Sequence, residues 1–164
     1  MIRDAVVSDF ATILELNAAD EHYLSPLDDA RLMLLHTQAT SHRVITVDRE
    51  TAGFLLAFDH DSGYAGLNFG WFARRISNFM YIDRVVIDSA FRGRRLGSAL
   101  YEDVIARARH RGIANIVCEY DLKPRNPGSA AFHAAMGFRE VGQWAAPGGS
   151  KICSMQQLVL GEMS

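Results

Sequence analysis

Apolar and polar positions along the chain follow two different periods, which divide it into expected strands and helices. Short runs rich in Val, Ile, Leu and Phe, bounded by turn residues, predict strands because these side chains suit a half-buried pleated surface. A turn at Asp48 to Ala52 separates two such runs and predicts a hairpin. The expected strands are Ile2–Val7, His42–Val47, Gly53–Phe58, Met80–Ile87, Ile113–Tyr120, Phe138–Trp144 and Ile152–Leu160.

Helical spacing and capping residues predict four helices between these strands. Ser8 is the expected N-cap of the first helix. The pair Ser25-Pro26 predicts the start of the second, with serine as the cap and proline at the first helical position. The third is expected from Arg95 to Arg111, and the fourth opens at Asn126-Pro127 and ends at about Met136.

This order of elements argues for one α/β domain with a single mixed sheet, spanning residues 1–164. A chain of 164 residues is long enough to bury a core without disulfides. Between Asp59 and Phe79 glycines alternate with aromatic residues, which predicts a loop with about one helical turn. A loop of this length in a compact domain is usually functional or disordered, and its aromatic residues argue against disorder.

The composition is ordinary for a globular protein, with 49% apolar and 22% charged residues. The formal net charge of −2 gives no reason to expect nucleic acid or a membrane as a partner. The first residues lack secretory features, and no apolar run approaches the roughly 18 residues of a membrane span, so a cytoplasmic location is expected. Cys118 and Cys153 have no metal-ligand spacing, and no metal is expected.

The segment from Val85 to Ser98 runs from an expected strand through a glycine-containing turn into an expected helix. The first N–H groups of a helix have no internal partner and lie at the positive end of its dipole, which favours a bound phosphate or pyrophosphate. Arg92, Arg94 and Arg95 can add charge-assisted contacts. From these residues alone, an ordinary helix start with solvated arginines remains an alternative.

Two motifs make the chain resemble the GNAT superfamily of N-acetyltransferases. Arg92 and Gly97 match the first and last positions of its coenzyme A-binding motif, Gln/Arg-x-x-Gly-x-Gly/Ala, whereas Arg95 replaces the middle glycine. The stretch from Asn126 to Phe138 resembles a second signature, Asn-x-x-Ala-x-x-hydrophobic-Tyr-x-x-x-Gly-Phe. The resemblance runs to about residue 160 and implies a mostly antiparallel mixed sheet flanked by helices.

The resemblance implies an enzyme that moves an acetyl group from acetyl-CoA to a primary amine of a small molecule, peptide or protein by direct attack. In that family the strand before the turn contacts the pantetheine arm through its main chain, and a nearby N–H stabilises the oxyanion. Asn126 has a second explanation as the N-cap of its own helix. The residues that the resemblance assigns to coenzyme A are Val85, Ile87, Arg92, Gly93, Arg94, Arg95, Leu96, Gly97, Ser98 and Asn126.

His133 stands where the family usually has a tyrosine that protonates the departing thiolate. An imidazole near its reference pKa of about 6.5 can donate a proton at neutral pH. A histidine that only packs or faces solvent is the alternative. Asp83 and Glu119, on strands expected side by side, are the candidate general bases, and their alternative is an ion pair with Arg84 or another arginine.

The family builds its acceptor pocket from the first two helices and from loops near the sheet. Here these segments contain Glu21, His22, Tyr64 and Trp71, which would give a partly apolar pocket with a few polar groups. The aromatic residues can equally belong to the core or to a dimer contact, and a homodimer is a family-level expectation. Two other functions fit the motifs: a non-catalytic acyl-CoA-binding sensor or scaffold, and a transferase of longer acyl groups.

Overall fold

The computed structural model describes residues 1–21, 24–145, 147–148 and 151–161, which contain one mixed sheet of seven strands. The strand order is β1-β2-β3-β4-β5-β7-β6, and each neighbouring pair is antiparallel except β4 and β5. The expected fold class is therefore confirmed. The strands are β1 Ile2–Asp4, β2 Ser41–Val47, β3 Glu50–Asp59, β4 Met80–Ile87, β5 Asn115–Lys123, β6 Arg139–Ala145 and β7 Ile152–Val159.

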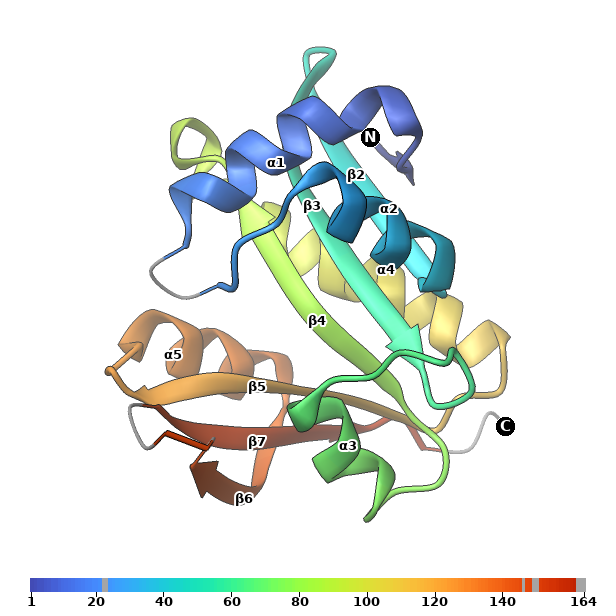
Figure 1. Ribbon diagram of the computed structural model, residues 1–164, viewed down its shortest axis with the longest axis vertical. Helices are drawn as coiled ribbons and strands as arrows, with labels where there is room; N and C mark the ends of the chain where they lie inside the picture. Colours follow the sequence, from blue (N-terminus) through green and yellow to red (C-terminus); the bar gives the residue numbers. More distant parts are fainter. Residues whose placement is uncertain (22–23, 146, 149–150, 162–164) are drawn as a thin grey trace.

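Helices cover both faces of this sheet (Figure 1). One face packs under the first three helices through fully buried side chains that include Ile13, Leu32 and Phe72. The other packs under the last two through residues that include Leu100 and Phe138. Each fully buried side chain of this size contributes about 1.5–3 kcal/mol. The helices are α1 Phe10–Ala19, α2 Asp29–Gln38, α3 Leu67–Ala73, α4 Leu96–His110 and α5 Pro127–Met136.

Two turns follow directly from local sequence signals. Asp48 and Arg49 join β2 to β3, and both have positive φ, 50° and 70°, as the two central residues of a tight hairpin turn often do. The basic last turn of α4 is followed by Gly112 at φ 76°, a left-handed position that glycine adopts without strain. The hairpin and the end of the third expected helix are confirmed.

The predicted start of the second helix at Ser25-Pro26 is wrong. The helix α2 begins at Asp29, and its N-cap is Asp28, whose carboxylate accepts a hydrogen bond of 2.7 Å from the Arg31 N–H. Ser25 is unavailable as a cap because its hydroxyl and carbonyl accept hydrogen bonds from the guanidinium of Arg84 on β4. A long-range contact therefore overrides the local capping signal.

The expected first strand and its cap also require correction. The strand β1 ends at Asp4, three residues before the predicted end, and a short 3₁₀ turn, Val7–Asp9, precedes α1. Asp9, not Ser8, occupies the N-cap of α1, and its carboxylate accepts hydrogen bonds from the side chain of Arg3 and the main chain of Val6. These bonds tie Asp9 to the preceding segment, and its carboxylate makes no capping bond to α1 itself.

The long segment between β3 and β4 contains more helix than expected. Seven residues form α3, and Phe69, Trp71 and Phe72 within it are buried. The Phe72 side chain is fully buried in the core, so the aromatic residues anchor this segment against the sheet. Its N-terminal end thereby lies next to the middle of β4 and β5 (Figure 1), where the candidate site is found.

Candidate active site

The strands β4 and β5 diverge after a short parallel contact. Only Met80 and Tyr81 pair with β5, opposite Ile116 and Val117. Beyond this contact β4 pairs with β3 alone, and its other edge faces the opening between the two strands. Two cavities, defined below, lie at this opening and share five lining residues: Leu24, Asp83, Arg84, Glu119 and Asp121.

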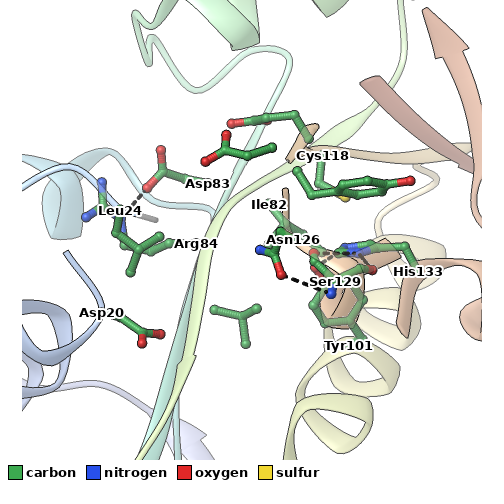
Figure 2. Close-up of a pocket in the computed structure, with 14 residues that line it drawn as sticks. Asp20, Leu24, Ile82, Asp83, Arg84, Tyr101, Cys118, Asn126, Ser129 and His133 are labelled. Atoms are coloured by element: carbon green, nitrogen blue, oxygen red, sulfur yellow. Dashed lines mark hydrogen bonds and ion pairs between the residues drawn. The ribbon is translucent and has the colours of Figure 1, made fainter. Parts of the chain in front are cut away.

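The first cavity, called the α5 cavity, has a volume of about 190 Å³ (Figure 2). Residues of α4 and α5 form its other wall. The second, called the α3 cavity, has a volume of about 310 Å³ and extends toward the N-terminus of α3. Besides the shared residues, the α5 cavity is lined by Asp20, Ile82, Val85, Tyr101, Cys118, Tyr120, Asn126, Ser129 and His133, and the α3 cavity by Ser25, Tyr64, Gly66, Leu67, Asn68, Tyr81, Lys151 and Cys153.

A β-bulge on β4 places two consecutive side chains on the same face. Leu56 of β3 is opposite Arg84 and Ala57 is opposite Ile82, which leaves Asp83 as the extra residue. Asp83 and Arg84 form an ion pair in which Nε of the arginine lies 2.6 Å from Oδ2 of the aspartate. The ion pair with Arg84, which was the alternative to a general-base role for Asp83, is therefore present in the structure.

Other side chains form hydrogen bonds with both members of this ion pair. The Tyr64 hydroxyl donates to Oδ1 of Asp83 at 2.7 Å, and Nη1 of Arg84 donates to Oδ1 of Asn17 at 2.9 Å. Burial and the charge of Asp83 raise the pKa of Tyr64, so it remains a neutral donor. Both oxygens of Asp83 are thus held by protein groups.

Glu119 on β5 has one satisfied and one free oxygen. Its Oε1 accepts hydrogen bonds of 2.8 Å from both Nδ2 of Asn68 and the hydroxyl of Tyr81, while its buried Oε2 has no partner. The indole N–H of Trp144 holds Oδ1 of Asn68 at 2.7 Å and so fixes the orientation of that amide. Burial raises the pKa of Glu119 to about 7, although the two donated hydrogen bonds act to lower it.

Asp121 lies two residues further along β5 and lines both cavities. Its buried Oδ2 also lacks a hydrogen-bond partner, although the ammonium of Lys151 lies 3.6 Å away. In the part of the chain that the structure describes, three buried side-chain atoms have no hydrogen bond. Two of these, Oε2 of Glu119 and Oδ2 of Asp121, belong to residues that line the same cavities. A ligand that donates N–H groups would satisfy both oxygens.

His133 on α5 is only 5% exposed, and protein groups hold both of its ring nitrogens. Nδ1 lies 2.7 Å from the Ser129 carbonyl oxygen, and Nε2 lies 2.8 Å from the Tyr101 hydroxyl. Burial lowers the pKa of this imidazole, against the backbone hydrogen bond, which raises it. Asn126 caps α5 by accepting a hydrogen bond from the Ser129 N–H, as its capping explanation predicts.

The turn before α4 presents unpaired backbone donors beside exposed arginines. Arg95 occupies the N-cap in a left-handed conformation, with φ 59° and no side-chain capping bond. The first intrahelical bond is donated by Ala99, so the N–H groups of Leu96, Gly97 and Ser98 have no helical acceptor. The side chains of Arg92, Arg94 and Arg95 are exposed around them. This arrangement suits a diphosphate.

A model of the Acetyltransferase (GNAT) family matches residues 10–138, which include both sequence motifs, the splayed strands and all of the residues that line the α5 cavity. The chain belongs to this family. Solved structures of acetyltransferases share the whole fold at low sequence identity. The comparison with curated proteins gives no match.

Three of these structures cover nearly all of the chain. A putative acetyltransferase of Salmonella typhimurium, solved with its cofactor acetyl-CoA, is 21% identical, covers 100% of this chain and 95% of its own, and has a TM-score of 0.76. A ribosomal-protein-alanine N-acetyltransferase of Brucella melitensis is 21% identical, with coverages of 97% and 99% and a TM-score of 0.74. An N-acetyltransferase of Staphylococcus aureus is 19% identical, with coverages of 98% and 98% and a TM-score of 0.73.

Some of the site residues predicted from the sequence of this GNAT chain line the cavities, and others do not. Asp83, Glu119, His133, Val85 and Asn126 line the α5 cavity. Residues 92–98, which form the turn before α4 and the start of that helix, lie outside both cavities, as does the half-buried Ile87 at the end of β4.

The suggested acceptor residues are also divided. Tyr64 lines the α3 cavity, whereas Trp71 is buried under Gly142 and Arg75 and lines neither cavity, because its ring fills the core. Glu21 is exposed and lines neither cavity, and His22 lies outside the described residues.

Sequence reasoning missed the partners of these groups. Tyr81 and Tyr101 touch Glu119 and His133 directly, yet the sequence indicated only that they lie on a strand and a helix. A polar aromatic residue on a core-facing position, such as Tyr101 next to Leu100, was the available signal. Within the described ranges, no helix is long and apolar enough to cross a membrane, and no group of three or more His, Cys, Asp or Glu side chains is arranged to hold a metal ion.

Proposed function

We propose that the protein transfers the acetyl group of acetyl-CoA to a primary amine of a small molecule or peptide by direct attack. The observation that carries this proposal is the position of Glu119. Glu119 lines both cavities, and its buried Oε2 has no hydrogen-bond partner in the described part of the protein. One cavity would then hold the thioester and the other the acceptor.

Acetyl-CoA fits the residues on the α5 side. The unpaired edge of β4 around Val85 offers backbone groups to the pantetheine amides, and Asn126 offers a side-chain amide from α5. The free N–H groups at the start of α4 and the exposed arginines beside them suit the diphosphate. A backbone N–H near Val85 would stabilise the oxyanion.

The α3 cavity suits an amine. Its volume of about 310 Å³ accommodates a small amine or the first residue of a peptide. The unpartnered Oε2 of Glu119 is an acceptor for which an ammonium supplies the missing N–H donor. Aromatic side chains, including Tyr64 and Tyr81, supply its apolar surface.

Glu119 would act as the general base. An amine must lose a proton to attack, and a base is most effective when its pKa lies near the working pH. Burial places the pKa of Glu119 at about 7, whereas Asp83 is already held by Arg84 and Tyr64. Glu119 has a free oxygen to receive the proton, and Asp83 has none.

The test combines binding with turnover. Acetyl-CoA at about 100 times its dissociation constant should raise the unfolding free energy by about 2.7 kcal/mol, and a panel of primary amines and short peptides should then be screened for thiol release. Stabilisation by acetyl-CoA together with amine-dependent thiol release supports the proposal. Stabilisation without turnover on any amine would instead favour the acyl-CoA-binding module.

A further inference from the structure

Protein groups hold Glu119 at one of its two carboxylate oxygens. Its Oε1 accepts one hydrogen bond from Nδ2 of Asn68 on α3 and one from the hydroxyl of Tyr81 on β4, each 2.8 Å long. An oxygen of an ionised carboxylate has two lone-pair sites, and these two donors use both of them. A proton added to this carboxylate must therefore bind at Oε2, which has no hydrogen-bond partner in the described part of the chain.

The chemistry of its two neighbours determines which way the Asn68 amide faces. An indole N–H can only donate, and that of Trp144 lies 2.7 Å from Oδ1 of Asn68. An ionised carboxylate can only accept, and Oε1 of Glu119 lies 2.8 Å from Nδ2 of the same amide. The opposite orientation would place two donors together at the indole and two acceptors together at the carboxylate. The indole therefore fixes Asn68 as a hydrogen-bond donor to Glu119.

These partners come from three different elements and are enclosed by the protein. Trp144 lies on β6 and packs against the core, and both it and Asn68 are half-buried. Tyr81 on β4 is only 2% exposed. Burial and the nearby carboxylates raise the pKa of Tyr81 well above its ordinary value, so its hydroxyl stays protonated and remains a donor. The arrangement of donors around Oε1 is thus set by packing and does not depend on a flexible surface side chain.

We propose that Asn68 and Tyr81 are positioning residues that hold Oε1 of Glu119, so that Oε2 receives the proton of the attacking amine, and that Trp144 acts through the Asn68 amide. This inference rests on the proposed acetyl transfer, in which Glu119 is the base. As the amine attacks, its N–H bond breaks, the nitrogen keeps the electron pair and the proton binds at Oε2. The proton passes to solvent after the product leaves, and Oε1 keeps both hydrogen bonds throughout.

The same hydrogen bonds affect the proton affinity of Glu119. Burial raises its pKa, and the bonds from Asn68 and Tyr81 oppose that rise because they stabilise the ionised form. The charges of Asp83 and Asp121 raise the pKa further. Loss of either donor should therefore raise the pKa above about 7, so that a smaller fraction of the protein holds an ionised base at neutral pH.

Other ionisable groups surround this carboxylate on several elements. Arg84 on β4 and Lys151 before β7 are cations that line the α3 cavity, and each is paired with one of the two aspartates. Asp20, which pairs with Arg92 at 3.4 Å, and Tyr120 line the α5 cavity. Burial keeps the remaining groups neutral at pH 7, because it lowers the pKa of His133 and raises the pKa of Tyr64, Tyr101, Cys118 and Cys153.

Asn115 provides a matched control on the same strand as Glu119. Its half-buried amide also makes two hydrogen bonds of 2.8 Å, because Nδ2 donates to the Asn78 carbonyl and Oδ1 accepts from Gln157. Neither bond reaches Glu119. Asn68→Leu and Asn115→Leu therefore each remove an amide with two partners, and only the first removes a donor to the base.

The experiment measures the pH dependence of kcat and the acetyl-CoA dissociation constant of the wild type and its variants. Asn68→Leu and Tyr81→Phe should each move the acid limb of kcat upward by about one pH unit. This shift lowers activity at pH 7 about fivefold and leaves the dissociation constant within about threefold of the wild type. Asn115→Leu should keep the wild-type limb. Tyr81→Phe removes a single oxygen atom and keeps the ring, so it tests the role even if Asn68→Leu does not fold.

The role of the indole is tested by a double variant. Trp144→Phe removes the N–H that orients the amide, so it should move the acid limb in the same direction as Asn68→Leu. The double variant Asn68→Leu/Trp144→Phe should show no larger shift than Asn68→Leu, because the indole acts only through the amide. Shifts that add in the double variant would overturn the role assigned to Trp144.

A second measurement does not need turnover. The pKa of Glu119 is obtained as the difference between the infrared pH titrations of each protein and of the same protein with Glu119→Gln. An unchanged limb and an unchanged Glu119 pKa in both Asn68→Leu and Tyr81→Phe would overturn the positioning role and leave acetyl transfer intact. An equal shift in Asn115→Leu would also overturn it, because a general loosening of β5 would then explain the effect. A wild type without amine-dependent turnover would overturn acetyl transfer itself, whatever the infrared titrations show.

Discussion

Asp83 and Arg84 are consecutive residues of β4, yet their side chains meet on one face of the sheet at 2.6 Å. Regular alternation along a strand would send them to opposite faces. The bulge at Asp83 removes that alternation at the point where β4 leaves β5. The same irregularity therefore opens the site and builds the ion pair beside it.

Breaking this buried pair should destabilise the protein. Arg84→Met would leave Asp83 as an uncompensated buried charge and should lower the unfolding free energy by about 3–5 kcal/mol. The double variant Asp83→Asn/Arg84→Met should recover part of that loss. Urea denaturation of the three proteins checks this, and equal losses in the single and double variants would contradict the ion-pair explanation.

Replacement of Glu119 by glutamine should lower activity but raise stability at alkaline pH. Its folded-state pKa of about 7 lies above the ordinary value of 4.5, so the folded state binds the proton more tightly. The stability that Glu119 contributes is therefore fully present below pH 4.5 and is lost as the pH rises through 7, by on the order of 3 kcal/mol. Glu119→Gln should lower kcat by about 10²–10⁴-fold and should raise the Tm at pH 8 relative to the wild type.

The pH dependence of activity gives the control for that experiment. If Glu119 is the base, wild-type turnover should fall as the pH drops below about 7, because the carboxylate becomes protonated. The residual activity of Glu119→Gln should lack this limb. Asp83→Asn should keep the fall in turnover below about pH 7. If this variant lost that fall, Asp83 and not Glu119 would be the base.

The turn before α4 can be tested at one glycine. Gly97 is the second residue of α4, and an added Cβ would lie 3.8 Å from the Phe132 ring, an ordinary contact. Gly97→Leu should raise the acetyl-CoA dissociation constant at least tenfold, because a side chain there blocks the approach of an anion to the free N–H groups.

The control is Gly128→Leu, at the second residue of α5, where an added Cβ meets nothing within 4 Å. This variant carries the same intrinsic change from glycine to leucine in the first turn of a helix. Isothermal titration should show unchanged acetyl-CoA affinity for it. Equal losses in both variants would mean that a general effect on helix starts, and not anion binding at α4, explains the result.

A histidine pair far from the site should control acid stability. Nδ1 of His36 lies 2.8 Å from Nδ1 of His42, whose pKa is lowered from 6.5 to about 4, first by burial and then by the charge of His36. The folded state therefore favours the neutral ring, and its contribution is complete above pH 6.5 and lost as the pH falls toward 4. The loss is on the order of 3 kcal/mol.

His42→Phe should remove much of this dependence. The new ring would pack between Phe10 and Phe54, which already contact the imidazole. Thermal unfolding of the wild type and the variant at pH 7.5 and pH 5 measures the difference. A Tm that drops equally in both proteins on acidification would assign the acid sensitivity to other groups.

Local signals in the sequence determined most of the elements and the turn before α4. These signals are the glycine after α4, the hairpin turn and the motif around Arg92 and Gly97. Each involves only a few neighbouring residues, so it can be recognised from the sequence alone. The order of strands and helices with the two motifs was enough to predict the fold and its family. Local capping signals failed at Ser25, whose polar atoms are taken by a residue 59 positions away.

Tertiary structure alone decided the chemistry of the site. Glu119 obtains its hydrogen bonds from residues 51 and 38 positions away, and His133 obtains the Tyr101 hydroxyl from 32 positions away. Burial, which raises the pKa of Glu119 and lowers that of His133, is a property of the packed sheet and helices and not of any segment. The sequence could name candidate acids and bases, but only packing determines which oxygen is free and which proton is already shared.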